Sequence, residues 1–168
     1  MGARLAWDEL LTVLLAFAPA DGARGFQLSS PSILDITALT AALSVFAESD
    51  MQTIVYRSKQ LTSYLEALMD DLVRHWARNN DSEAHPCTML TPRDSLKRGA
   101  MLSLRWHNIA MLERIVQRLQ KVHVVVDIRK PDIMRITPSP LYTSYVDVWW
   151  FCDKLKEALS QEVTSEVV

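Results

Sequence analysis

The sequence contains few of the residues that metal sites, phosphate-binding loops and disulfide frameworks require. Among 168 residues there are four glycines, two cysteines and four scattered histidines. The glycines form no glycine-rich phosphate loop, and no two histidines share metal-ligand spacing on one helix face. Cys87 and Cys152 lie far apart without a CxxC motif, which favours a reducing, cytoplasmic environment. We therefore expect no metal site and no catalytic nucleophile with a base at local spacing.

Neither charge nor hydrophobicity is extreme. The 18 basic and 20 acidic residues leave a formal charge of −2, which gives no indication of nucleic-acid or membrane binding. An apolar run, Leu11–Ala20, is too short to span a bilayer and follows the acidic Asp8 and Glu9, so it predicts a helix rather than a signal peptide. A composition of 49% hydrophobic and 23% charged residues is typical of an ordinary globular domain.

Apolar residues at helical spacing predict five helices, over residues 1–17, 32–47, 51–78, 109–120 and 144–160. Ser32 and Asp50 are suitable N-caps for the second and third helices. The apolar stripe of each helix is expected to face a core. In the second helix this stripe comprises Ile33, Ile36, Leu39, Leu43 and Phe46.

Four strands are predicted, over residues 87–90, 101–106, 124–126 and 132–137. The apolar run Val124–Val126 is typical of a strand buried on both faces. The resulting order β-β-α-β-β-α predicts an α+β fold, with an open, mainly antiparallel sheet that carries helices on one face. The connection with Arg93, Lys97 and Arg98 is predicted to be a solvated basic loop; the alternative is a loop that contacts an anion or another subunit.

The last predicted strand holds one arginine between apolar neighbours. Ile133, Arg135 and Thr137 alternate with Met134 and Ile136, so Arg135 points to the uncovered side if the latter two face the helices. An arginine on a rigid element is suited to bidentate binding of a carboxylate or phosphate. The same pattern also fits a surface arginine whose aliphatic stem packs along an edge strand.

One segment, VVVDIRKPDIMRITPSPLYTSYVDVW at residues 124–149, contains an aspartate, a basic turn, an MR pair and a PLYTS sequence. In these features, and in TPRDSLKRGAMLSL, YRSKQLTSYLEAL and the stretch from Ala18 to Phe46, the sequence resembles the C-terminal part of kynureninases. The resemblance implies the small C-terminal domain of a fold-type I, aminotransferase-like enzyme over residues 18–168. Residues 1–17 form an unmatched N-terminal helix.

The resemblance also implies a reaction and two site residues. Kynureninases use pyridoxal 5'-phosphate to hydrolyse L-kynurenine to anthranilate and L-alanine, in tryptophan catabolism and the kynurenine pathway to NAD. Arg135 matches the family arginine that binds the substrate's α-carboxylate. Ser30 matches an asparagine or threonine that contacts the cofactor, or the substrate end of the site, from the neighbouring subunit. Where the family has a glycine before the VVxD segment, this sequence has His123, a departure that we expect to change a turn.

The family's Schiff-base lysine lies upstream of the matched segments, and nothing in this sequence matches it. We therefore expect the chain alone to bind no pyridoxal phosphate, to contain no catalytic residue and to show no turnover. Its expected partner is a second copy or a large domain, as in a homodimer or in a kynureninase split between two chains. The alternative is a non-catalytic module that binds a small carboxylate or another protein.

Overall fold

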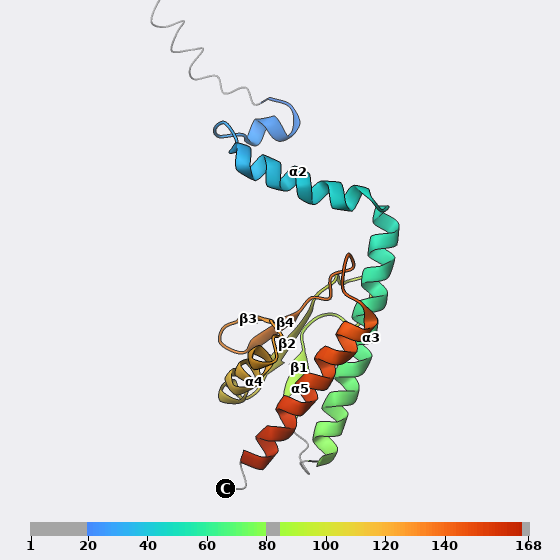
Figure 1. Ribbon diagram of the computed structural model, residues 1–168, viewed down its shortest axis with the longest axis vertical. Helices are drawn as coiled ribbons and strands as arrows, with labels where there is room; N and C mark the ends of the chain where they lie inside the picture. The colour runs from blue at the N-terminus through green and yellow to red at the C-terminus, as the bar shows by residue number, and fades with distance from the viewer. Residues whose placement is uncertain (1–19, 80–84, 166–168) are drawn as a thin grey trace, which may run out of the picture. The chain divides into compact units, whose positions relative to one another are not determined.

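The structure, a computed structural model, describes residues 20–79 and 85–165 (Figure 1). The chain divides into two compact units, Met1–Glu48 and Ser49–Val168, and each is described by itself. The helix predicted over residues 1–17 lies outside the described residues. None of the helices within residues 20–79 and 85–165 is both long and apolar enough to cross a lipid bilayer.

The first unit contains a short 3₁₀ helix, η1 (Gly22–Phe26), and the helix α2 (Ile33–Ala47). Ser32 is the N-cap of α2, as predicted, and its hydroxyl accepts a hydrogen bond from the Asp35 N–H at 3.4 Å. The prediction of a buried stripe was wrong: Ile33 is 76% exposed and Leu39 58% exposed. Apolar and small residues occur all around α2, so no single face is set apart as a core face.

The second unit contains the predicted sheet and its helices. Its described helices are α3 (Met51–Asn79), α4 (Ile109–Lys121) and α5 (Tyr145–Ser165), and its strands are β1 (Cys87–Met89), β2 (Leu102–Trp106), β3 (Asp127–Arg129) and β4 (Ile133–Ile136). The four strands lie in the order β1-β2-β4-β3, and every neighbouring pair is antiparallel. The helices α3 and α5 lie side by side (Figure 1). The predicted α+β order is therefore confirmed.

One face of the sheet forms the core with the three helices. Leu102, Leu104 and Trp106 of β2 are 0%, 2% and 1% exposed, as their alternation predicts. Each leucine-sized side chain that is fully buried contributes about 1.5–3 kcal/mol relative to an exposed one. The helices contribute Leu61, Leu65, Met69 and Leu72 from α3, Leu112, Ile115 and Leu119 from α4, and Val148, Phe151, Leu155 and Leu159 from α5.

The segment Val124–Val126 is not the doubly buried strand that its composition predicts. Val124 is 8% exposed and Val125 90% exposed, and β3 begins only at Asp127, on the edge of the sheet. The backbone N–H of Val124 donates to Leu119 O at 2.9 Å, so it closes the end of α4 instead of joining the sheet.

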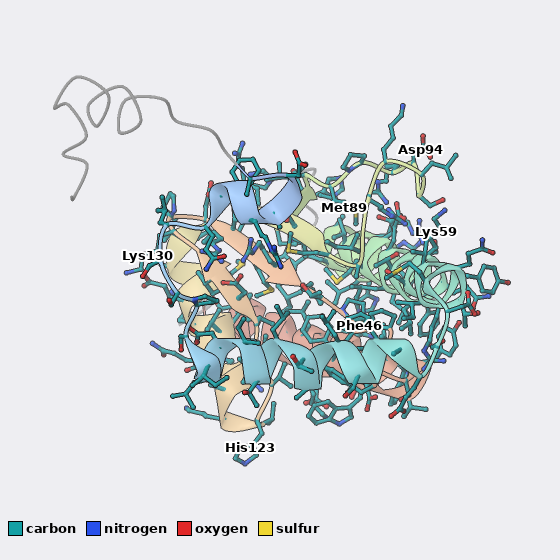
Figure 2. All side chains as sticks on the ribbon, turned by 90° about the horizontal axis from the view of Figure 1, so that it is seen from above. Phe46, Lys59, Met89, Asp94, His123 and Lys130 are labelled. Atoms are coloured by element: carbon teal, nitrogen blue, oxygen red, sulfur yellow. The ribbon has the colours of Figure 1, made fainter. Side chains whose placement is uncertain are left out.

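His123 makes this helix ending possible because it adopts a left-handed backbone conformation with φ of 60°. Its N–H donates to Gln120 O at 3.0 Å, which with the bond from Val124 to Leu119 O forms a Schellman motif. The His123 side chain is exposed and extends away from the chain (Figure 2). The predicted departure from the family's glycine therefore falls at the position where a helix ending favours glycine.

The basic connection between β1 and β2 is largely exposed, as predicted, but one of its arginines is buried. The Arg98 side chain is only 1% exposed, and its Nη2 lies 2.5 Å from Glu66 Oε2 of α3. Arg93 contacts Glu66 and Asp70, which lie one helical turn apart on α3. The prediction was wrong for Arg98, which is buried against a carboxylate of α3, whereas Arg93 is paired but 57% exposed. Lys97 does remain on the surface, with its side chain 74% exposed.

A second cluster of charges joins α4 to α5. Glu162 of α5 is 1% exposed and accepts a hydrogen bond from Arg114 Nε at 2.8 Å. Arg118 also binds Glu162, and its Nη1 donates to Ala158 O at 2.9 Å. Burial alone would raise the pKa of Glu162, but the hydrogen bonds from the two arginines outweigh it and hold the pKa below its usual value. Glu162 is therefore a buried, ionised carboxylate that holds two helices together.

Candidate carboxylate-binding site

Arg135 lies in the middle of β4, on the face of the sheet opposite the core. Its neighbours Met134 and Ile136 are 0% and 9% exposed on the inner face. Across the outer face its Cα partners are Ser103 of β2 and Asp127 of β3. The Arg135 side chain is 26% exposed, so part of it reaches solvent. The alternation of β4 thus places Arg135 where the sequence predicted it.

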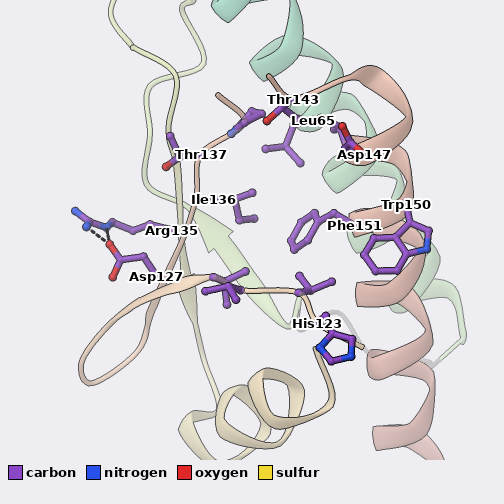
Figure 3. A pocket seen from close by; sticks show the side chains of 15 residues that line it. Leu65, His123, Asp127, Arg135, Ile136, Thr137, Thr143, Asp147, Trp150 and Phe151 are labelled. Carbon is purple, nitrogen blue, oxygen red and sulfur yellow. Dashed lines mark hydrogen bonds and ion pairs between the residues drawn. The ribbon is translucent and has the colours of Figure 1, made fainter. Parts of the chain in front are cut away.

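Asp127 is the direct partner of Arg135. Nε of Arg135 donates to Asp127 Oδ2 at 2.7 Å, and Nη2 of Arg135 donates to the same oxygen (Figure 3). Nη2 of Arg129 lies 3.2 Å from this oxygen. The hydrogen bonds from Arg135, with the positive charge of Arg129, hold the pKa of Asp127 below its usual value. At neutral pH the three residues therefore form one carboxylate between two guanidinium groups.

The guanidinium of Arg135 keeps donors that Asp127 does not use. A guanidinium has five N–H groups, and Asp127 takes the edge formed by Nε and one N–H of Nη2. Within the described parts of the chain, no group accepts a hydrogen bond from Nη1 of Arg135. The edge formed by Nη1 and Nη2 can therefore bind a second carboxylate in two parallel charge-assisted hydrogen bonds.

A cavity of about 700 Å³ adjoins this arginine. Its walls come from the end of β4, the segment before β3 and the first half of α5, and include the aromatic side chains of Trp150 and Phe151. In Figure 3, the side chains of Arg135 of β4 and Asp127 of β3 lie together, on the side away from Ile136 and Phe151. Arg135 is thus at the rim of the cavity, with apolar and aromatic surface on the far side of the strand.

The loop after β4 is held in place by hydrogen bonds at several points. Oγ1 of Thr143 accepts from the Ser139 N–H at 3.0 Å, and Nη2 of Arg57 in α3 donates to Thr143 O at 3.1 Å. Ser144 begins α5 in a capping box: its N–H donates to Asp147 Oδ2 at 2.7 Å, and the Asp147 N–H donates back to Ser144 Oγ at 3.2 Å. These bonds fix the loop that borders the cavity.

Ser30, the other predicted site residue, belongs to the first unit. It is exposed and lies two residues before the N-cap of α2, directly before Pro31. Ser30 and Arg135 are each placed within their own unit, and the role of each remains a prediction.

The contact between Asp127 and Arg135 was not predicted from the sequence. The signal was present, because a hairpin that turns at Lys130–Pro131 pairs Arg129 with Ile133 and Asp127 with Arg135. We instead assigned the preceding strand to the valines before Asp127, which left this aspartate in the turn. The apolar run concealed the register of the hairpin.

Comparison with known proteins identifies the family. The model of the kynureninase C-terminal domain matches residues 54–155, more than half of the chain. This chain belongs to the kynureninase family. It is 42% identical over 142 residues to kynureninase 1 of Aspergillus clavatus, covering 84% of this chain and 28% of that protein. To kynureninase 1 of Neurospora crassa it is 39% identical over 143 residues, covering 85% of this chain and 29% of that protein.

The kynureninase match is therefore to a C-terminal domain, and the chain spans less than a third of the length of these curated relatives. Among solved structures, the fold is similar to 8-amino-7-oxononanoate synthase from Francisella tularensis, with a TM-score of 0.53 and 17% identity. That similarity covers 96% of this chain and 41% of the synthase. The resemblance and the fold class inferred from the sequence are both confirmed.

Proposed function

We propose that this domain provides the substrate-carboxylate site of a kynureninase, an enzyme that hydrolyses L-kynurenine to anthranilate and L-alanine. The observation that supports the proposal is the free edge of Arg135 on the outer face of the sheet. Two parallel hydrogen bonds to an α-carboxylate restrict both the position and the rotation of a bound amino acid. The part of this chain in the reaction is then to bind and orient the substrate.

The proposed cofactor, pyridoxal 5'-phosphate, does not fit the described residues by themselves. The cofactor is attached through the amine of a lysine, and none of the 15 residues that line the cavity beside Arg135 is a lysine. We assign the lysine and the cofactor to a large domain that acts together with residues 18–168. Ser30 is proposed to contact the edge of the cofactor, and residues 1–17 to form a separate N-terminal segment.

The proposal includes a protein partner, which is either the large domain or a second copy of this domain. Large apolar side chains on the second unit support it, because Tyr142 is 82%, Val146 71% and Trp149 52% exposed. Sedimentation of the purified chain alone, and then with a large domain, measures the association. A chain that stays monomeric under both conditions contradicts this part of the proposal.

Complementation tests the proposed activity. The chain is mixed with the N-terminal part of Aspergillus clavatus kynureninase 1, truncated before the matched segment, and anthranilate is followed by its fluorescence in the presence of pyridoxal phosphate. We expect turnover from the mixture and none from either part alone. With Arg135→Ala, kcat/KM is expected to fall roughly 100-fold, because two charge-assisted hydrogen bonds to the substrate are lost.

Arg105→Ala is the matched control. Arg105 lies on the same outer face of the sheet, its side chain is 52% exposed and it pairs with Asp132 at 3.4 Å. We expect this variant to keep the kcat/KM of the unmodified chain. Equal losses in the Arg105 and Arg135 variants, or kynurenine hydrolysis by the chain without a large domain, would overturn the proposal.

A further inference from the structure

We infer that Asp127 is a positioning residue for the carboxylate site: it holds one edge of Arg135 and thereby directs the other edge toward a ligand with a single carboxylate. This inference rests on the proposed function of Arg135 and goes beyond it, because it assigns a role to the aspartate and defines the charge that the site accepts. Three observations carry it: the geometry of the contact, the strand register and the local charge.

The geometry is that of a side-on contact. Nε and Nη2 of Arg135 both donate to Asp127 Oδ2, with 2.7 Å between Nε and that oxygen. Two bonds from one edge of the guanidinium to one oxygen keep that edge against Asp127 and so restrict how far the group can turn. A free arginine has several rotatable side-chain bonds, so without this contact the edge that receives the ligand would take up many directions.

The register makes the contact part of the fold. Asp127 and Arg135 are Cα partners in the antiparallel pair β3–β4, so their side chains leave the same face of adjacent strands. The backbone hydrogen bonds of the hairpin hold the two residues opposite each other whether or not a ligand is present. Arg135 is therefore oriented before the ligand binds, which reduces the conformational entropy lost on binding.

The net charge of Asp127, Arg129 and Arg135 together favours binding of one singly charged anion. Asp127 carries one negative charge, and Arg129 and Arg135 carry two positive charges, so one positive charge remains. The hydrogen bond from Arg135 contributes most to lowering the pKa of Asp127, so the aspartate stays ionised at neutral pH. Because Arg129 compensates Asp127, the aspartate does not cancel the attraction of Arg135 for an incoming carboxylate.

A competing role for Asp127 predicts the opposite sign. If the aspartate only occupied Arg135 and competed with the ligand, its removal would free the guanidinium, raise the local positive charge and strengthen carboxylate binding. If it positions Arg135, its removal weakens binding in spite of the added positive charge. The direction of the change therefore separates the two roles.

The test uses the mixture of this chain with the Aspergillus clavatus large domain. With Asp127→Ala we expect KM for kynurenine to rise and kcat/KM to fall about 10-fold or more. Asp127→Asn keeps an oxygen that can accept from Nε, so it should recover part of the loss. Asp132→Asn, which removes the carboxylate paired with Arg105, is the control and should leave both constants unchanged. An unchanged or lower KM for Asp127→Ala overturns the inference.

A second measurement separates this inference from the proposed function. If the unmodified mixture shows no turnover, the proposed function fails, and Asp127 is then examined by ¹⁵N NMR of arginine side chains in the isolated chain. The Nε–H signal of Arg135 is assigned by its loss in Arg135→Lys. We expect its exchange with water to be slow in the unmodified chain and at least 10-fold faster in Asp127→Ala. Equal exchange rates would show that Asp127 does not hold Arg135.

Discussion

Replacement of His123 by glycine should stabilise this domain. His123 is the residue after the C-cap of α4 and has φ of 60°, a conformation in which the Cβ of an L-residue approaches the following carbonyl group. Its imidazole is exposed, so little packing is lost when it is removed. Glycine adopts this conformation without the steric cost and keeps the backbone N–H groups that close the helix.

The magnitude follows from two opposing contributions. Relief of the left-handed conformation contributes about 1–2 kcal/mol to the folded state. Glycine also gains freedom in the unfolded chain, which offsets about 0.4–1 kcal/mol of that. The net gain in the free energy of unfolding therefore lies between about 0 and 1.6 kcal/mol, with a midpoint of about 0.8 kcal/mol. For a domain of this size, such a gain raises Tm by roughly 2–5 °C.

Urea denaturation followed by circular dichroism measures this gain, with His123→Ala as the matched control. Alanine also removes the imidazole but keeps a Cβ in the left-handed conformation, so His123→Ala should be no more stable than the unmodified chain. The difference between the glycine and alanine variants isolates the backbone contribution. If the glycine variant is equal to or less stable than the alanine variant, the assignment of strain to residue 123 is wrong.

Three further predictions concern buried polar groups. Glu162→Gln should cost about 2–3 kcal/mol at pH 7, because two arginines lose a buried carboxylate. The pKa of Glu162 lies below its usual 4.5, so the stability that its ionised form contributes is present above about pH 4.5. That contribution is lost as the pH falls through the lowered pKa. The unfolding curves of the unmodified chain and of Glu162→Gln should therefore converge in acid. Glu66→Ala should cost about 3 kcal/mol, because this glutamate binds two arginines. Arg98→Met should cost only about 1 kcal/mol, because the buried Nε of Arg98 has no hydrogen-bond partner among the described residues. Urea titration of both variants gives the order. Burial raises the pKa of Cys87 and Cys152 to about 12, so both thiols should react with a disulfide reagent at pH 8 only after denaturant is added, as absorbance of the released thiolate would show.

Local sequence patterns predicted the helices and strands better than their boundaries. The alternation in β2 and the capping residues of α2 and α3 depend on nearest neighbours, and the structure has them where predicted. The valines before β3 were misassigned because their composition suits a strand, whereas their backbone groups are used elsewhere. Closing α4 requires the N–H of Val124, and that requirement is set by where the helix ends.

In the candidate site, too, the features set by neighbouring residues could be predicted, and those set by contacts between strands could not. The side of the sheet on which Arg135 lies follows from a period of two, which the sequence displays directly. The partner of Arg135 depends on the register between two strands, and a shift of three residues in β3 was enough to hide Asp127. The role of Ser30 cannot be derived in this way, because it depends on groups that neither strand register nor helix periodicity of this chain places near it.

Acceptor count, more than exposure, decides which arginine can bind a ligand. Arg93 is 57% exposed and Arg135 only 26%, so exposure alone would select Arg93. Yet Asp70 already occupies the end of Arg93, with Nη1 at 2.7 Å from Oδ2 and Nη2 at 2.9 Å from Oδ1. This ion pair shows, within the same chain, the bidentate geometry proposed for a substrate carboxylate. The two carboxylates of α3 take three N–H groups of Arg93, including those of its end-on edge. Strand β3 gives Arg135 a single oxygen that binds from the side, so the end-on edge formed by Nη1 and Nη2 stays open in Arg135.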